Sequence, residues 1–164
     1  MSESPGFNPY QAPAAPLSDP FYGTEQETPT ERLYSPHQIM GATWLGSPFA
    51  GSWLLAANYR ALGRPELFQK TLSIGAVTTL ALFLLTFALP ASFPNSVLPI
   101  AYSFAMLELA KRFQGPAFDA HIVNGGPKHS PWRAAGIGLL SLLAIVVVAM
   151  TLGIAYVLIF DAEF

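Results

Sequence analysis

The acid Glu108 is the residue of this sequence whose type and position most directly suggest chemistry. It is the only acid within a hydrophobic segment. Such acids are energetically costly in a membrane and often mark proton or cation paths. However, Lys111 and Arg112 follow at three and four residues, a spacing that forms ion pairs on a helix. We therefore favour a local ion pair near the aqueous end of the segment, with proton or cation transfer as the alternative.

The other polar residues form no catalytic or metal-binding pattern. Asn58 ends an apolar stretch, where placement at a membrane interface explains it. His121 and His129 lie near Asp119, but their spacing matches no standard zinc site. The chain has no cysteine, phosphate loop, nucleophile elbow or HExxH motif. We thus expect no enzyme, no cofactor and no metal, with Glu108 and Asn58 as the candidate functional polar residues.

The composition indicates an integral membrane protein. Hydrophobic residues make up 52% of the chain and charged residues only 11%, whereas soluble domains carry about 25% charged residues. The net charge of −2 offers no phosphate-neutralising face, so nucleic acid is not an expected partner.

Four apolar segments follow a polar tail, and they predict an all-α membrane protein with four transmembrane helices. The helices are expected at about 36–61, 65–89, 96–112 and 131–160, within a helical membrane domain spanning 36–164. About 20 apolar residues cross a membrane core. Ser35, Pro36 and Gln38 read as a capping box, and Ser130-Pro131 repeats this helix start. The turn signals after Lys111 and Arg112 predict that residues 113–130 form the longest loop.

The first segment, 39–59, is the one whose crossing the sequence leaves open. It contains no charge, but it is rich in small and weakly polar residues and holds Pro48 near its middle. It is either a kinked spanning helix, which we favour, or a re-entrant or interfacial segment. The side of the membrane on which the N-terminal tail lies depends on this choice.

Residues 1–35 are expected to form a disordered, proline-rich tail. Seven of the fifteen prolines lie within residues 1–36, and few large aliphatic residues are present to bury. A solvated tail is the favoured interpretation. The alternative is a short docking motif at residues 8–13, Asn-Pro-Tyr-Gln-Ala-Pro.

The basic residues predict the orientation. With four crossings, the loops 60–70 and 111–133 share one side and hold seven of the eight lysines and arginines. The positive-inside rule places that side in the cytoplasm. The C-terminus is then periplasmic, whether or not segment 39–59 crosses.

Small residues at four-residue spacing form two stripes in the first segment. Such faces let helices approach closely in lipid, and Gly75 lies on a similar face of the second segment. We expect packing within the chain, with self-association as the alternative. The candidate helix-packing residues are Ala42, Gly46, Ala50, Ser47, Gly51 and Gly75.

Two blocks of sequence resemble small bacterial inner-membrane proteins. One is the tail motif at residues 8–13, and the other runs from Ser35-Pro36-His37-Gln38-Ile39 through Leu45-Gly46-Ser47-Pro48 to Asn58-Tyr59-Arg60-Ala61-Leu62-Gly63. Together they cover about a third of the chain. The resemblance implies a multi-pass protein of the bacterial inner membrane. It brings no activity and no functional residues with it.

These observations favour a non-enzymatic function. We expect a scaffold, accessory or interaction subunit whose partners are the lipid bilayer and either a second copy or another membrane protein. The alternative is an oligomeric channel or transporter subunit that uses Glu108. A membrane-embedded enzyme is a distant third, because too few polar groups converge.

Overall fold

The chain is all-α, as predicted, throughout the residues that the structure describes. The computed structural model describes residues 30–90 and 92–160. Within them it contains five helices and no strand, apart from one isolated bridge between Leu33 and Lys128. The helices are α1 (Pro36–Leu45), α2 (Pro48–Ala61), α3 (Pro65–Ala88), α4 (Val97–Val123) and α5 (Pro131–Phe160). Residues 1–29 of the tail predicted at 1–35, including its docking motif, lie outside the described residues.

The predicted capping box at the start of α1 is confirmed. The Ser35 Oγ atom accepts from the Gln38 amide at 3.3 Å, and Gln38 Oε1 accepts from the Ser35 amide at 2.9 Å. Pro36 occupies the first turn, where its missing N–H leaves no bond unmade.

The segment predicted as one helix over 36–61 is two helices that reverse direction. Proline disfavours helical geometry in the residue before it, and Ser47 accordingly has extended angles (φ 165°, ψ 173°). Pro48 then opens α2 as its first residue. Pro48 therefore starts a new helix and does not kink a continuous one.

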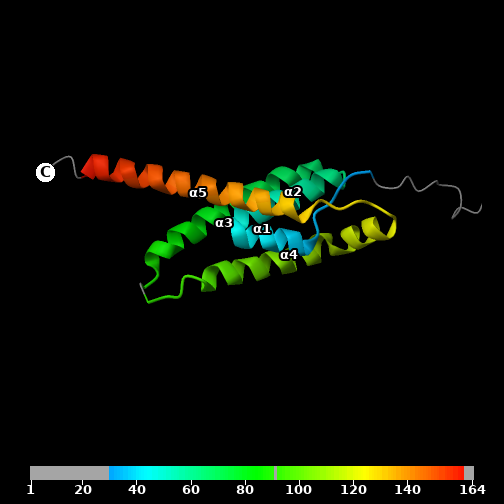
Figure 1. Ribbon diagram of the computed structural model, residues 1–164, viewed down its shortest axis with the longest axis horizontal. Helices are drawn as coiled ribbons and strands as arrows, with labels where there is room; N and C mark the ends of the chain where they lie inside the picture. The colour runs from blue at the N-terminus through cyan, green and yellow to red at the C-terminus, as the bar shows by residue number, and fades with distance from the viewer. Residues whose placement is uncertain (1–29, 91, 161–164) are drawn as a thin grey trace, which may run out of the picture.

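The helical hairpin, which we define as α1 and α2, enters and leaves the molecule at the same end. Figure 1 shows α1 and α3 running away from that end, α2 and α4 returning to it, and α5 running away past the others. We call this end, which holds residues 30–35, 62–64 and 124–130, the basic end. The opposite end, with the α3–α4 turn at 92–96, is the turn end.

The hairpin forms the core, and the three long helices surround it. No Cα atom of α3, α4 or α5 lies within 8 Å of a Cα atom of another of the three, whereas all three approach α1 or α2. Eight residues of α2 are buried, but only Gly75 is buried in α3. The fold thus places its small and weakly polar segment inside and most large apolar side chains of α3 and α5 outside.

Within the described residues, two helices are long and apolar enough to cross a membrane, fewer than the four predicted. They are α3 and residues Pro131–Ile159 of α5. Segment 39–59 does not form a helix long enough to cross a membrane, because α1 has only 10 residues and α2 only 14. The apolar part of α4 is followed by Lys111 and Arg112 and by a polar extension.

The predicted loop 113–130 is largely helical, which corrects the sequence interpretation. Helix α4 continues through Gly115-Pro116 to Val123, because Gln114 and His121 are buried and hold this part against the rest of the fold. Of the two turn signals in this stretch, Gly115-Pro116 and Asn124-Gly125, only Asn124-Gly125 forms a turn. Gly125 adopts a φ of +77°, which favours glycine, and the chain reverses there.

Candidate functional site

A buried polar network at the basic end joins three separate parts of the chain. Asn58 is 2% exposed and makes three hydrogen bonds. Its Oδ1 atom accepts from the Tyr34 amide at 2.8 Å, and its Nδ2 atom donates to the Tyr34 carbonyl at 2.8 Å and to Gln114 Oε1 at 3.0 Å. Gln114 Nε2 donates to the Leu55 carbonyl at 2.8 Å. Asn58 is therefore buried inside the fold, and its predicted position at a membrane interface stays a prediction.

The segment before α1 is tied to the α4–α5 loop by backbone bonds. The Leu33 amide donates to the Pro127 carbonyl at 3.3 Å, and the His129 amide donates to the Leu33 carbonyl at 2.9 Å. Gln38 Nε2 adds a bond to the His129 carbonyl at 2.8 Å. Leu33 and Tyr34 are consequently among the most buried residues, so the predicted tail does not extend to residue 35.

Two aromatic rings stack at the surface of this network. The Tyr34 and His129 rings are 4.1 Å apart at 28°. Burial, and secondarily the positive charges of Arg133 and Arg32, lower the pKa of His129, while Glu31 acts in the opposite direction. Burial raises the pKa of the Tyr34 phenol despite the neighbouring Arg133. The surroundings therefore favour a neutral imidazole stacked on a neutral phenol.

The network links separate parts of the fold. Each side-chain amide oxygen and nitrogen of Asn58 and Gln114 bonds to a protein partner. His121 Nε2 lies 3.0 Å from the Pro127 carbonyl and supports the same loop. Within residues 30–90 and 92–160, no group of three His, Cys, Asp or Glu side chains could hold a metal ion.

Glu108 lies on the surface in the predicted ion pair with Lys111. The Lys111 Nζ atom is 3.1 Å from Glu108 Oε1, and both side chains are exposed. This pair lies near the middle of α4, where the neighbouring Leu109 lines a groove together with Lys70 of α3. The structure does not bring Glu108 together with Asn58.

The candidate packing residues lie at contacts between helices of one chain. A Cβ atom at Gly51 would meet Thr43 across the hairpin, and one at Gly46 would meet the backbone of Gly138 in α5. A Cβ atom at Gly75 would meet Ser52, which joins α3 to α2. The remaining candidates, Ala42, Ala50 and Ser47, are buried at 1%, 0% and 5% exposure.

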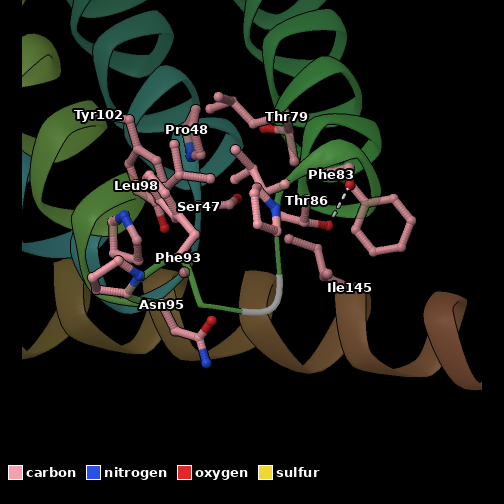
Figure 2. Close-up of a pocket in the computed structure, with 16 residues that line it drawn as sticks. Ser47, Pro48, Thr79, Phe83, Thr86, Phe93, Asn95, Leu98, Tyr102 and Ile145 are labelled. Carbon is pink, nitrogen blue, oxygen red and sulfur yellow. Dashed lines mark hydrogen bonds between the residues drawn. The ribbon is translucent and has the colours of Figure 1, made fainter.

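A cavity of about 460 Å³, which we call the tip cavity, lies where the hairpin reverses. Figure 2 shows Ser47 and Pro48 of the hairpin tip facing Thr79 of α3 and Tyr102 of α4. Residues of the α3–α4 turn close the far side, including Asn95. The cavity therefore extends from the turn end to the break between α1 and α2.

Sequence reasoning missed Gln114 and the tip cavity. Gln114 has a detectable signal, because the buried face of α4 at Ser103, Leu107 and Ala110 repeats every three or four residues and reaches it. The cavity has none, because its residues come from helices that only the tertiary fold brings together.

Comparison with protein-family models, with curated proteins and with solved structures found no match to this chain.

Proposed function

We propose that this chain is an integral protein of the bacterial inner membrane and that it acts as a non-enzymatic scaffold or accessory subunit. In this arrangement α3 and α5 cross the bilayer, α4 returns across it because it runs in the direction opposite to both, and the α1–α2 hairpin is re-entrant from the basic end. The function of such a protein is to hold another membrane-spanning helix.

The distribution of side chains supports the membrane location. Large apolar residues point outward along α3 and α5, for example Leu80 at 59%, Leu140 at 68% and Ile159 at 63% exposure. In water, exposed apolar surface of this extent would be strongly unfavourable. In lipid it is expected, since small residues then form the interior. The resemblance of residues 35–63 to bacterial inner-membrane proteins agrees with this location.

The charge distribution supports one orientation. All eight lysines and arginines lie on the basic end, on the turns of α2 and α5 next to it, or on the halves of α3 and α4 that lead to it, and the α3–α4 turn at 92–96 carries no charge. The positive-inside rule then places the basic end in the cytoplasm and the C-terminus in the periplasm. Because the hairpin returns to its starting end, the N-terminal tail is cytoplasmic as well.

The groove between α3 and α5 is the observation that carries the scaffold function. These helices do not pack on each other, and between them lies a groove of about 480 Å³. Its lining is almost wholly apolar and includes the small residues Ala76, Ala144 and Ala149. Small side chains let the backbone of a further helix approach closely, which is the main source of helix association in lipid.

Cysteine cross-linking in intact membranes tests this function, because the chain has no cysteine of its own. Ala149→Cys places a thiol in the groove, and Val147→Cys places a matched thiol on the opposite, exposed face of α5. The introduced thiol is modified with a reagent that cross-links to a neighbouring protein on illumination. We expect one discrete cross-linked product from Ala149→Cys and none from Val147→Cys. Its mass distinguishes a second copy from another membrane protein. Monomer alone from both variants would contradict the proposal.

The alternative function, a channel or transporter subunit that uses Glu108, has less support. In a single chain the Glu108 carboxylate is exposed beside Lys111, and it lines neither the α3–α5 groove nor the tip cavity. A role in transport would therefore require a partner to enclose it.

A further inference from the structure

A second groove lies between α3 and α4, with α2 as its floor, and we call it the α3–α4 groove. Its volume is about 450 Å³. No Cα atom of α3 lies within 8 Å of one of α4, so the two walls of the groove stand apart. The wall residues extend over 67–78 of α3 and 102–113 of α4. Each run advances about 16 Å along its helix, which is close to the depth of one leaflet of a bilayer core, about 15 Å.

Tyr59 and Lys70 lie at the end of this groove that is nearer the basic end. Gly75 of α3 faces Ser52 of α2, and these two helices run in opposite directions (Figure 1). Lys70 precedes Gly75 by five residues, and Tyr59 follows Ser52 by seven. Both are therefore about 7–11 Å closer to the basic end than that contact is. With the basic end in the cytoplasm, this end of the groove lies at the cytoplasmic boundary of the bilayer core.

The charge of the groove comes from Lys70, the only charged residue among the described residues that line it. Within residues 30–90 and 92–160, Lys70 makes no ion pair, although Glu66 precedes it by one turn. Lys111 on α4, by contrast, is paired with Glu108. The anions at the cytoplasmic boundary of a membrane are the phosphate groups of lipids, which attract basic side chains. The Tyr59 hydroxyl provides a neutral hydrogen-bond donor at the same end.

The remaining lining of the groove suits a hydrocarbon chain better than a further helix. Large apolar side chains line both walls, including those of Leu67, Ile74, Leu109 and Phe113. Helices associate in lipid mainly through small residues. The α3–α5 groove has three alanines for such an approach, whereas Ala105 is the only alanine that lines the described part of the α3–α4 groove. An acyl chain needs no close approach between backbones, because it is flexible and thin.

We propose that the α3–α4 groove binds one anionic phospholipid of the cytoplasmic leaflet. The lipid phosphate lies at Lys70 and Tyr59, and one acyl chain follows the groove between Ile74 and Leu109. The bound lipid then joins α3 to α4, which do not pack on each other. This site goes beyond the scaffold function, but it rests on the membrane location and orientation proposed with it. It does not require Glu108.

Native mass spectrometry of the full chain, purified in detergent, tests the lipid site. The chain is titrated with dioleoylphosphatidylglycerol, which is anionic, and with dioleoylphosphatidylcholine, which has the same acyl chains but no net charge. We expect the first copy of the anionic lipid to bind about fivefold more tightly, the effect of one basic side chain near a lipid surface. Equal affinities, or no retained lipid of either kind, would overturn the proposal.

Substitutions of Lys70 test whether this residue is the source of the preference. Lys70→Gln should lose the preference for the anionic lipid, whereas Lys70→Arg retains the positive charge and should keep it. The matched control is Arg64→Gln, which removes an exposed positive charge at the same end of α3 but outside the groove. Equal effects of Lys70→Gln and Arg64→Gln would assign the preference to the general charge of the basic end and would overturn the site.

Filling the groove tests the position of the acyl chain. Ala105 is exposed on the α4 wall, so Ala105→Trp should reduce the binding of both lipids. Ala144→Trp makes the same change in the α3–α5 groove and should leave lipid binding unchanged. Equal lipid binding by these two variants and the parent chain would overturn the placement in the α3–α4 groove. If Ala105→Trp does not fold, the Lys70 variants decide the proposal, because Lys70 is exposed.

The photochemical reagent used for the α3–α5 groove distinguishes a lipid from another helix. Attached to Ala105→Cys, it should give no discrete cross-linked protein. Such a product would show that a protein occupies the α3–α4 groove and would overturn the lipid site. This result is independent of the scaffold function, which is tested by the product from Ala149→Cys in the other groove.

Discussion

At the scale of single residues, polar side chains inside this fold act through the bonds they complete. Asn58 satisfies both backbone groups of Tyr34 and also Gln114, so one side chain joins α2, α4 and the segment before α1. A buried amide is tolerated because all of its bonds are made. Removing it should therefore cost more than the bonds themselves, because their partners stay buried.

Replacing Asn58 by alanine should destabilise the fold. It leaves the Tyr34 amide, the Tyr34 carbonyl and Gln114 Oε1 buried without their partner. A single group stranded in this way costs about 1–3 kcal/mol. We expect a clearly lower thermal unfolding midpoint in detergent. Asn95→Ala, on the exposed turn, is the matched control and should melt like the parent chain. Equal midpoints for both variants would show that the network contributes little.

His129 should make stability depend on pH. Its pKa in the folded chain is lowered below the ordinary value of 6.5, chiefly by burial. Below about pH 6.5 the unfolded chain therefore binds a proton that the folded chain excludes, so stability falls as the pH falls. At higher pH the imidazole is neutral in both states and contributes no pH dependence.

Unfolding midpoints measured between pH 5 and pH 8 test this effect, with His129→Phe as the comparison. Phenylalanine retains a ring for stacking on Tyr34 but cannot titrate. The loss of stability on the acidic side should be smaller in His129→Phe than in the parent. Parallel curves would assign the pH dependence to other groups.

At the scale of elements, the hairpin depends on close approach between backbones. Its two arms meet where Gly51 faces Thr43, and it meets the long helices where Gly46 faces Gly138 and Gly75 faces Ser52. Each of these contacts leaves no room for a Cβ atom. The small residues of segment 39–59 thus determine how closely three helices surround it.

Gly75→Ala should push α3 away from α2. The added methyl group would overlap the Ser52 side chain, and overpacking of this kind costs about 1–3 kcal/mol. Gly136→Ala in α5 meets nothing within 4 Å and should be neutral or stabilising by about 0.5–1 kcal/mol. Thermal midpoints of the two variants provide the comparison.

A second substitution separates packing from helix propensity. If the contact with Ser52 causes the loss, Ser52→Gly in the Gly75→Ala background should restore much of the stability, since it makes room for the methyl group. No recovery would mean that Gly75 acts through some other contact.

At the scale of the whole molecule, the hairpin brings the chain before α1 to the same end as the α4–α5 loop. Because α1 and α2 return to one end, the chain before α1 lies beside the α4–α5 loop and is bonded to it through Leu33. A spanning segment 39–59 would instead place that part of the chain at the turn end.

Cysteine labelling of sealed vesicles distinguishes the two topologies. Ser18→Cys in the tail and Ser130→Cys before α5 should react from the same side, and Asn95→Cys from the opposite side. Reaction of Ser18→Cys together with Asn95→Cys would restore the four-crossing arrangement and remove the re-entrant hairpin.

The sequence by itself determined the helical class and most helix starts. Prolines at positions 36, 65 and 131 each open a helix in the structure, because a proline costs nothing in the first turn. The glycine of Asn124-Gly125 likewise marks a true turn, because it supplies a positive φ. These signals are local, and local geometry is sufficient to interpret them.

Only the tertiary structure decided what happens at Pro48 and Pro116, because the local sequence is compatible with both outcomes. Pro48 begins a returning helix, since the reversal lets Gly51 pack on Thr43 and Gly46 on Gly138. Pro116 stays inside α4, since the buried Gln114 fixes the helix before it. Pro116 removes one helical hydrogen bond from α4, whereas Pro48, in the first turn of α2, removes none. Whether the chain turns at each of these prolines depends on contacts with residues distant in sequence, and the local sequence does not predict those contacts.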